Sequence, residues 1–202
     1  MIIKDYLLYF SNNVYKDSLY IHLRRDYKIK DETKFFNDVE VLYRDGQAIV
    51  YMIHNISRYT KIWMDGYIYL PSKVLIDVIN SILINAGLET LAYKDRSGFV
   101  IGKITAKTAY LNGFLYEIDL KNESVHAYTD EEIEVGKKVV VITEGVSLDE
   151  KRYFLNYDLE GQKIDAYLIS EKDLLISELD KAIIIDKQAD IGSDFFYLEE
   201  KR

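Results

Sequence analysis

The chain has 202 residues, of which 49% are hydrophobic and 30% charged, enough for one substantial globular domain and a small appendage. Its 34 acidic and 26 basic residues give a formal net charge of -8, which argues against nucleic acid as a partner because phosphate neutralisation needs a basic surface. The sequence has no cysteine, no recognisable signal peptide and no bilayer-length apolar run, so we expect a soluble, cytoplasmic protein without a membrane partner.

The first third of the chain is predicted to form a small antiparallel β unit. Apolar and polar residues alternate over Leu19–Leu23, as in a strand with one buried face. The apolar runs Val39–Tyr43 and Ala48–Ile53 flank the dipeptide Asp45-Gly46. An Asp-Gly pair between two strand-like runs favours a β-hairpin, because glycine accepts a positive φ without steric cost. The N-terminal segment is therefore expected to be β-rich.

A second Asp-Gly pair, Asp65-Gly66, is expected to join two further short strands. The character of the sequence then changes at Pro71, the only proline. From residue 74 to 86 apolar residues recur at helical spacing, and Gly87 follows as a typical helix stop. This pattern predicts an amphipathic helix.

The remainder of the chain is predicted to alternate strands and helices around a polar, acidic gap at Asn122–Val135. Such alternation is typical of an α/β fold with a parallel sheet covered by helices. The expected strands are Phe99–Ile101, Phe114–Ile118, Lys138–Ile142, Ile164–Ile169 and Ala182–Ile185, and the expected helices are Ile104–Asn112 and Leu148–Leu159.

The segment after Val139–Ile142 is the candidate ligand site, because ligands of open α/β sheets bind at the carboxyl ends of strands. The helix expected over Leu148–Leu159 begins here, with Ser147 and Glu150 as a reciprocal capping box. Asp149 adds a carboxylate to the same turn. A phosphate about 4 Å from such a carboxylate is disfavoured by about 4 kcal/mol at an effective dielectric constant of about 20. The sequence therefore predicts a helix end that repels phosphate.

The order of these elements resembles that of type I phosphoribosyltransferases, and most of all the orotate phosphoribosyltransferases. Lys61–Leu70 is similar to the strand that ends in an aspartate before the first large helix of those enzymes. Phe99–Gly113 is similar to their pyrophosphate-loop strand and the helix that follows it. Val135–Lys151 lies where the family has its phosphoribosyl pyrophosphate signature.

The resemblance implies roles for individual residues. Glu144 takes the position that holds the ribose hydroxyls, Asp65 lies on the base side, and His126 and Lys103 are the candidate catalytic groups. The counterparts of the ribose and phosphate site are Thr143, Glu144, Gly145, Ser147, Asp149 and Glu150, and those of the pyrophosphate loop are Gly102, Lys103, Ile104 and Thr105. No set of metal ligands is evident.

The signature departs from the family at its phosphate end, where Asp149-Glu150 replaces two glycines. Those glycines allow backbone N–H groups to surround the 5′-phosphate. We therefore expect an orotate phosphoribosyltransferase-like protein of pyrimidine metabolism with impaired catalysis. It would act as a regulatory or ligand-sensing homologue that binds a nucleotide or sugar phosphate, with no certain cofactor.

Two alternatives stay open. In the first, the chain is an active transferase in which Glu144 holds the ribose, Lys103 contacts the pyrophosphate and magnesium bridges the phosphate oxygens. In the second, it is a structural or protein-interaction module in which the antiparallel N-terminal third and the Tyr-rich faces form an interface. A homodimer is expected from the resemblance, because the related enzymes are usually dimers.

The candidate residues also have structural explanations: Ser147 and Glu150 as a helix cap, Glu144 as a surface residue at a strand end, and Lys103 and His126 as solvated side chains. The expected organisation is a β-rich segment or hood over 1–56, an α/β core over 57–190 and a tail over 191–202. With 18 tyrosines, one proline and no cysteine, the composition resembles thermophile usage.

Overall fold

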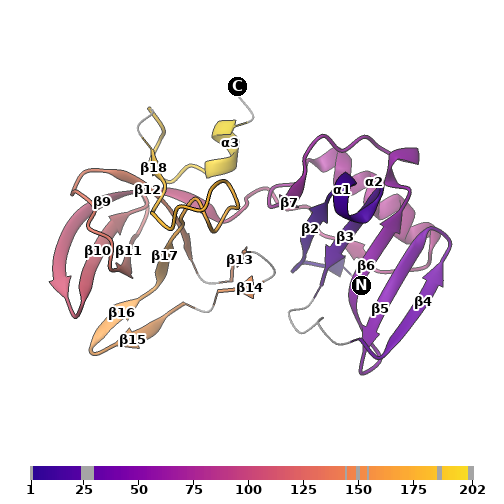
Figure 1. Ribbon diagram of the computed structural model, residues 1–202, viewed down its shortest axis with the longest axis horizontal. Coiled ribbons are helices and arrows are strands. Elements are labelled where there is room, and N and C mark those ends of the chain that lie inside the picture. Colours follow the sequence, from indigo (N-terminus) through magenta and orange to yellow (C-terminus); the bar gives the residue numbers. More distant parts are fainter. Residues whose placement is uncertain are drawn as a thin grey trace. The chain divides into compact units, whose positions relative to one another are not determined.

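The computed structural model describes residues 2–23, 30–143, 145–148, 151–153, 155–185 and 188–199. It divides the chain into two compact units, Met1–Asp95 and Arg96–Arg202, which we call the N-terminal unit and the barrel unit. The division falls inside the range 57–190 that the resemblance assigned to a single core. Both units are built mainly from antiparallel strands (Figure 1), so the predicted parallel α/β core is wrong.

The N-terminal unit contains a six-stranded antiparallel sheet in the order β4-β5-β6-β3-β2-β7. Its strands are β2 (Leu7–Phe10), β3 (Ser18–His22), β4 (Glu32–Phe36), β5 (Val39–Arg44), β6 (Gln47–His54) and β7 (Gly66–Ile68). The smaller elements of the unit are β1 (Ile2–Ile3), which pairs in parallel with β8 (Thr90–Leu91), the short helix α1 (Asn12–Tyr15) and the 3-10 turn η1 (Ile56–Arg58).

The predicted hairpin between β5 and β6 is confirmed. Asp45 and Gly46 both have positive φ angles, 50° and 72°, as the tight turn between twisted strands requires. The second Asp-Gly pair behaves differently, because Lys61–Met64 is not a strand. Gly66 instead begins β7, which pairs with β2 and not with the segment before it. The expected second hairpin is therefore wrong, since the partner of β7 comes from a distant part of the sequence.

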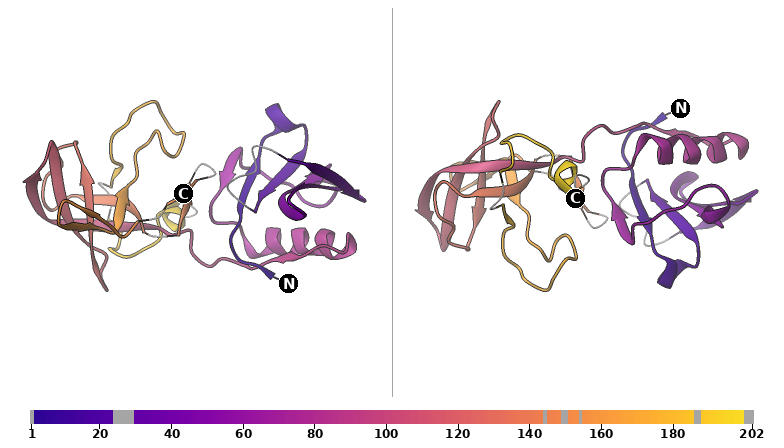
Figure 2. Two further views of the ribbon diagram at one scale, coloured as in Figure 1. Left: turned by 90° about the horizontal axis from the view of Figure 1, so that it is seen from below. Right: turned by 90° about the horizontal axis from the view of Figure 1, so that it is seen from above.

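The predicted amphipathic helix is confirmed as α2 (Lys73–Asn85). It begins where the Ser72 hydroxyl accepts the Leu75 N–H at 3.2 Å, and Gly87 follows its end with φ 70°. One face of α2, including the buried Ile79 and Leu83, packs against the sheet, and the helix lies along the sheet in Figure 2. Burial of each such side chain contributes about 1.5–3 kcal/mol. Among the described residues, no helix is long and apolar enough to cross a membrane.

His22, on β3, should make the N-terminal unit sensitive to acid. Burial lowers the pKa of its imidazole from 6.5 to about 4, so the unfolded chain takes up a proton at a higher pH than the folded chain. The free energy of unfolding is therefore not reduced by His22 above pH 6.5, where the imidazole is neutral in both states. It should fall by up to about 3 kcal/mol as the pH is lowered from 6.5 towards about 4, because only the unfolded chain is then protonated at His22. Urea denaturation at pH 7 and pH 4.5 should show this loss, and His22→Leu should reduce it. Equal losses in both proteins would contradict this assignment.

The barrel unit contains a second antiparallel sheet in the order β11-β10-β9-β12-β17. These strands are β9 (Phe99–Tyr110), β10 (Gly113–Asp119), β11 (Ser124–Thr129), β12 (Lys138–Thr143) and β17 (Ala166–Leu168), and β18 (Ile184–Ile185) also pairs with β12. Two small hairpins follow β12, formed by β13 (Ser147–Leu148) with β14 (Lys151–Arg152) and by β15 (Tyr157–Leu159) with β16 (Gln162–Ile164), and the short helix α3 (Phe195–Glu199) lies near the end.

The sheet of the barrel unit nearly closes on itself between its two end strands, β11 and β17. The His126 N–H donates to the Asp165 carboxylate at 2.6 Å, and the Asp165 N–H donates to the His126 carbonyl at 3.1 Å. The first three strands form a meander, the fourth (β12) pairs with the first (β9), and the fifth (β17) pairs with the fourth and approaches the third (β11). This is the plan of a five-stranded Greek-key OB barrel. In such barrels ligands bind on the face of the second and third strands and the adjoining loops.

The helix predicted over Ile104–Asn112 is wrong, because these residues belong mostly to the long strand β9. The register of β9 against β10 shifts between Glu117 and Ile118, which leaves Thr105 as an extra residue. Such a β-bulge reverses which positions point inward and interrupts the period of two that identifies a strand in a sequence. Ile104 is fully buried on one side of the bulge, and Lys107 lies opposite the buried Tyr116 on the other.

The helix predicted over Leu148–Leu159 is also wrong, since this stretch contains strands β13, β14 and β15. Leu148 and Leu155 are both buried, although they do not lie on a helix. Gly161, expected to stop that helix, instead has φ 91° in the turn between β15 and β16. The strand β11 likewise lies within the expected acidic gap, where Val125 and Ala127 alternate into the core.

The apolar strand β12 is buried on both sides, although its neighbours are antiparallel. Val139 and Val141 belong to the barrel core, while Val140 and Ile142 alternate to the opposite side, and all four are fully buried. Two-sided burial arises here without a layer of crossover helices. A continuous apolar run therefore indicates that a strand is buried on both sides, but it does not indicate whether the neighbouring strands are parallel or antiparallel.

Candidate functional site

The residues predicted for the pyrophosphate loop form no loop. Gly102, Lys103, Ile104 and Thr105 lie within β9, where Ile104 is part of the barrel core. A Cβ on Gly102 would lie 2.4 Å from the Ile118 side chain, so this glycine permits strand packing and not the approach of a phosphate.

The counterparts of the ribose and phosphate site do not surround a helix N-terminus. Thr143 ends β12, and Gly145 lies in a turn where its N–H donates to the Tyr153 carbonyl at 3.0 Å. Ser147 begins β13. The remaining three, Glu144, Asp149 and Glu150, lie outside the described residues. The described part of this segment contains no helix N-terminus, so the argument that a capped helix repels phosphate does not apply to it.

The other predicted site residues are dispersed. Lys103 is exposed on β9 and lies opposite Asp119 of β10, while His126 lies opposite Glu117 on the outer face of the barrel. Asp65 belongs to the N-terminal unit. Within the barrel unit, Lys103 and His126 therefore lie on the two different strands that flank β10.

A different site is present in the barrel unit, at the seam between β11 and β17. It is a cavity of about 320 Å³, at the lower end of the range for small-ligand pockets. It adjoins the third strand of the barrel, β11, on the side of β17. The residues that line it are Tyr128, Thr129, Asp130, Glu131, Tyr167, Leu168, Ser170, Asp180 and Ala182.

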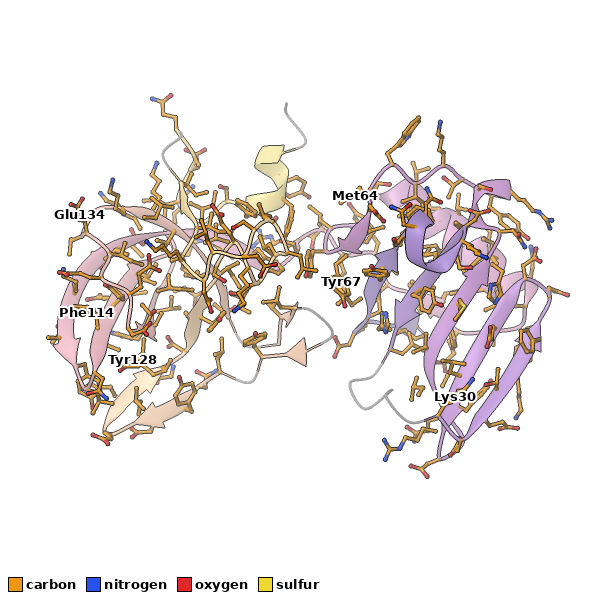
Figure 3. The ribbon with its side chains drawn as sticks, in the orientation of Figure 1. Lys30, Met64, Tyr67, Phe114, Tyr128 and Glu134 are labelled. Atoms are coloured by element: carbon orange, nitrogen blue, oxygen red, sulfur yellow. The ribbon has the colours of Figure 1, made fainter. Side chains whose placement is uncertain are left out.

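Two tyrosines provide the aromatic part of this cavity. Tyr128 is on β11 and is labelled in Figure 3, and Tyr167 is on β17. The Tyr167 ring stacks on Tyr153 with the ring centroids 5.0 Å apart. Burial raises the pKa of the Tyr167 hydroxyl, and the negative charge of Asp173 raises it further. Tyr167 therefore stays protonated and donates to the Asp173 carboxylate at 3.3 Å.

Hydrogen bonds fix the two chain segments that border the cavity. The N–H and the hydroxyl of Ser170 both donate to Asp173, each at 2.8 Å. On the opposite border, one oxygen of the Glu131 carboxylate accepts the Ala182 N–H at 2.7 Å. The Glu131 carbonyl accepts the hydroxyl of the buried Tyr116 at 2.9 Å. The lining is consequently held in place by backbone contacts as well as by side chains.

The charged side chains that line the cavity are acidic. Asp130 and Asp180 are exposed carboxylates on its border, and no lysine or arginine is among the residues lining it in the described part of the chain. Lys172 lies just outside and pairs with Asp180 at 3.3 Å, so an ammonium group of the protein already occupies this border. The barrel unit has 14 basic and 22 acidic residues, a net charge of -8, whereas the N-terminal unit has 12 of each.

The chemistry of the cavity suits an organic cation. Aromatic rings attract ammonium and guanidinium groups through their negative faces, and carboxylates form charge-assisted hydrogen bonds with them. Among the described residues, no group of His, Cys, Asp and Glu side chains could hold a metal ion.

The sequence contains one sign of this site, the acidic stretch Asp130–Glu134 within the polar gap expected over Asn122–Val135. Tyr167 and Asp180 lie far along the chain, and neither belongs to a recognisable motif. They reach the acidic stretch only because β17 returns to β11 when the barrel closes. No pattern within either segment could have predicted this pairing.

In the N-terminal unit, a serine, a histidine and a glutamate lie in the order of a catalytic triad. The Ser18 hydroxyl lies 3.1 Å from His54 Nδ1, and His54 Nε2 lies 3.0 Å from the Glu40 carboxylate. A catalytic serine needs a substrate next to its hydroxyl. Ser18 is only 4% exposed, so this arrangement is a cross-strand hydrogen-bond chain that ties β3, β6 and β5 together.

No protein-family model matches the chain, and no curated protein matches it significantly. The inference of function consequently depends on the cavity of the barrel unit, its charge and the topology that forms it.

Proposed function

We propose that the protein is a binding module whose barrel unit recognises a basic side chain, arginine or lysine, presented by a partner protein. The observation that carries this proposal is the cavity at the β11–β17 seam, in which Tyr128 and Tyr167 lie beside Asp130, Glu131 and Asp180. Aromatic rings and carboxylates together favour a cation with an apolar stem, which is the chemistry of lysine and arginine side chains.

A partner with basic side chains fits the charge of the barrel unit better than a nucleic acid does. Five-stranded barrels of this plan often bind oligonucleotides on the face of their second and third strands, but a fold alone does not assign a function. Here the outer face of those strands includes Glu117 and Asp119, and the unit has a net charge of -8. Phosphate groups would be repelled, whereas positively charged side chains would be attracted.

This proposal develops the interaction-module alternative and moves it to the barrel unit. The hypothesis of a phosphoribosyltransferase-like protein depended on a parallel sheet around β12 and on a helix after it. In the described residues the neighbours of β12 are antiparallel, and short strands follow it. The expectations of a sugar-phosphate ligand, of magnesium and of a homodimer came from the same resemblance, so they are not part of this proposal. We place the binding activity in the cytoplasm, consistent with the cysteine-free sequence.

The test is an NMR titration of the full chain with N-acetylarginine amide and N-acetyllysine amide. Both should shift the signals of Tyr128 and Tyr167, with a dissociation constant on the order of 1 mM because a single side chain is bound. Replacing both exposed carboxylates, Asp130→Asn with Asp180→Asn, should weaken binding about tenfold, since each exposed charge contributes up to about 1 kcal/mol. Lys172→Gln should strengthen binding, because it releases Asp180 from its internal partner.

The matched control is Glu117→Gln with Glu123→Gln, which removes two exposed charges from the same unit away from the cavity. This control should leave the affinity within about twofold of the original, because distant exposed charges are screened by salt. N-acetylnorleucine amide, which has no charge, should not bind. If both double variants weaken binding equally, the net charge of the unit and not the cavity explains the binding, and the proposal fails. Tight binding of a single-stranded RNA oligonucleotide would also overturn it.

A further inference from the structure

A loop formed by residues 171–181, which we call the 171–181 loop, borders the cavity and has a defined conformation. Its ends are joined by the antiparallel bridge between Ser170 and Ala182, two residues that line the cavity. Within it, the Lys172 N–H donates to the Leu179 carbonyl at 3.1 Å. In Figure 2 this gold-coloured segment extends away from the strands of its own unit. The loop is therefore a structured projection beside the proposed binding site.

The end of the 171–181 loop presents aliphatic side chains to solvent. Leu175, Ile176 and Leu179 are 67%, 61% and 56% exposed, and we call these three residues the tip cluster. Single exposed apolar residues are common, but three large ones within five positions form a patch of the kind found at interaction sites. Leu175 also has φ 57°, a conformation that a bulky residue rarely adopts. The tip cluster thus contributes little to the core.

Acidic residues accompany the tip cluster. Asp173, Glu178 and Asp180 lie in the same loop, and Asp180 also lines the cavity. Leu179 directly precedes Asp180 in the chain, so the tip cluster and an acidic residue of the cavity lie next to each other along the loop. A partner surface complementary to both would combine apolar and positively charged side chains.

We infer that the partner is an amphipathic basic segment, which places an arginine or lysine in the cavity and a neighbouring leucine-like side chain on the tip cluster. This inference rests on the proposed function, since it assigns the partner of the same site. The cation provides orientation and specificity, while burial of the apolar side chains provides most of the additional affinity. Two other occupants fit less well. A second copy of the barrel unit has the same net charge of -8, and an anionic membrane surface repels the acidic loop.

The experiment compares two short peptides that share one central arginine. In the first, leucines lie two and three positions from the arginine, and in the second these leucines are replaced by serine. The full chain should bind the leucine peptide about tenfold more tightly than the serine peptide, as expected for partial burial of two apolar side chains. In the variant Leu175→Ser, Ile176→Ser and Leu179→Ser this advantage should fall to about twofold or less, while the affinity for the serine peptide should stay unchanged.

The matched control is Val74→Ser with Ile84→Ser, which removes exposed aliphatic side chains from α2 in the N-terminal unit. It should keep the full advantage of the leucine peptide. If the tip variant keeps that advantage while Asp130→Asn with Asp180→Asn still weakens the serine peptide, the inference fails and the proposed function stands. If neither peptide responds to the carboxylates, both fail. A dimer of the full chain that dissociates in the tip variant, or binding of anionic vesicles through the tip, would also overturn the inference.

Discussion

Replacing Gly113 with alanine should destabilise the barrel unit by about 3 kcal/mol or more, because a side chain has no room at this position. Gly113 begins β10, and a Cβ there would lie 2.4 Å from the Thr129 carbonyl oxygen and 3.0 Å from the Asp130 Cα. Both obstructing atoms are backbone, so the clash is relieved only if β10 and β11 separate. Thr129 and Asp130 also line the cavity, and the substitution should therefore weaken cation binding as well.

Urea denaturation and hydrogen exchange at the amides of β10 and β11 measure this effect. The control is Gly87→Ala in the N-terminal unit, where nothing lies within 4 Å of the added Cβ but φ is 70°. That control should cost about 1 kcal/mol, from the strained backbone alone. A Gly113→Ala protein as stable as the Gly87→Ala protein would show that the strands can separate without a large penalty.

Replacing Asp194 with alanine should cost about 3 kcal/mol, because its buried carboxylate satisfies several donors at once. Asp194 is 8% exposed and accepts the Ser97 N–H at 2.6 Å, the Ser97 hydroxyl at 2.8 Å and the Phe196 N–H at 3.0 Å. These bonds join α3 to the start of β9, where the Phe196 ring packs edge-on against Phe99 at 5.2 Å. Without the carboxylate, the N–H groups of Ser97 and Phe196 lose their acceptor.

Thermal denaturation should show the loss, and fluorescence or exchange signals near Phe196 should show that α3 detaches first. Asp194→Asn should be intermediate, since one amide oxygen replaces two carboxylate oxygens. The exposed Asp190 provides a control, because Asp190→Asn removes the same charge close by. Equal destabilisation by Asp190→Asn and Asp194→Ala would mean that net charge and not the buried hydrogen bonds explains the effect.

The two units differ in what they offer a partner. The N-terminal unit has as many basic as acidic residues, and its largest exposed aromatic side chain, Trp63, is 81% exposed with Lys61 3.6 Å above its ring. The barrel unit carries the entire net negative charge and the cavity. A basic partner is therefore attracted to the barrel unit by charge before it reaches the cavity.

Part of the candidate site was visible in the sequence. Asp130 and Glu131 were recognised as members of an acidic stretch, but the stretch was expected to be a gap, whereas β11 occupies much of it. Val125 and Ala127 provide only two inward positions, too few to stand out as a strand pattern. The other half of the cavity, Tyr167 and Asp180, carries no motif at all.

The sequence by itself determined the elements whose cause is local. The helix α2 follows from its apolar spacing, its Ser72 cap and Gly87, and the β5–β6 hairpin follows from Asp45-Gly46. These features depend on residues within a few positions of one another, which a sequence displays directly.

Tertiary structure alone decided the direction of the strands and the closure of the barrel. Whether β12 has parallel or antiparallel neighbours depends on its pairing with β9 and β17, and its apolar sequence suits either arrangement. The bulge at Thr105 shows the same limit, because it arises from the register against β10 and breaks the alternation of β9. The cavity forms only when β17 meets β11, since its tyrosines and carboxylates come from segments that the barrel brings together.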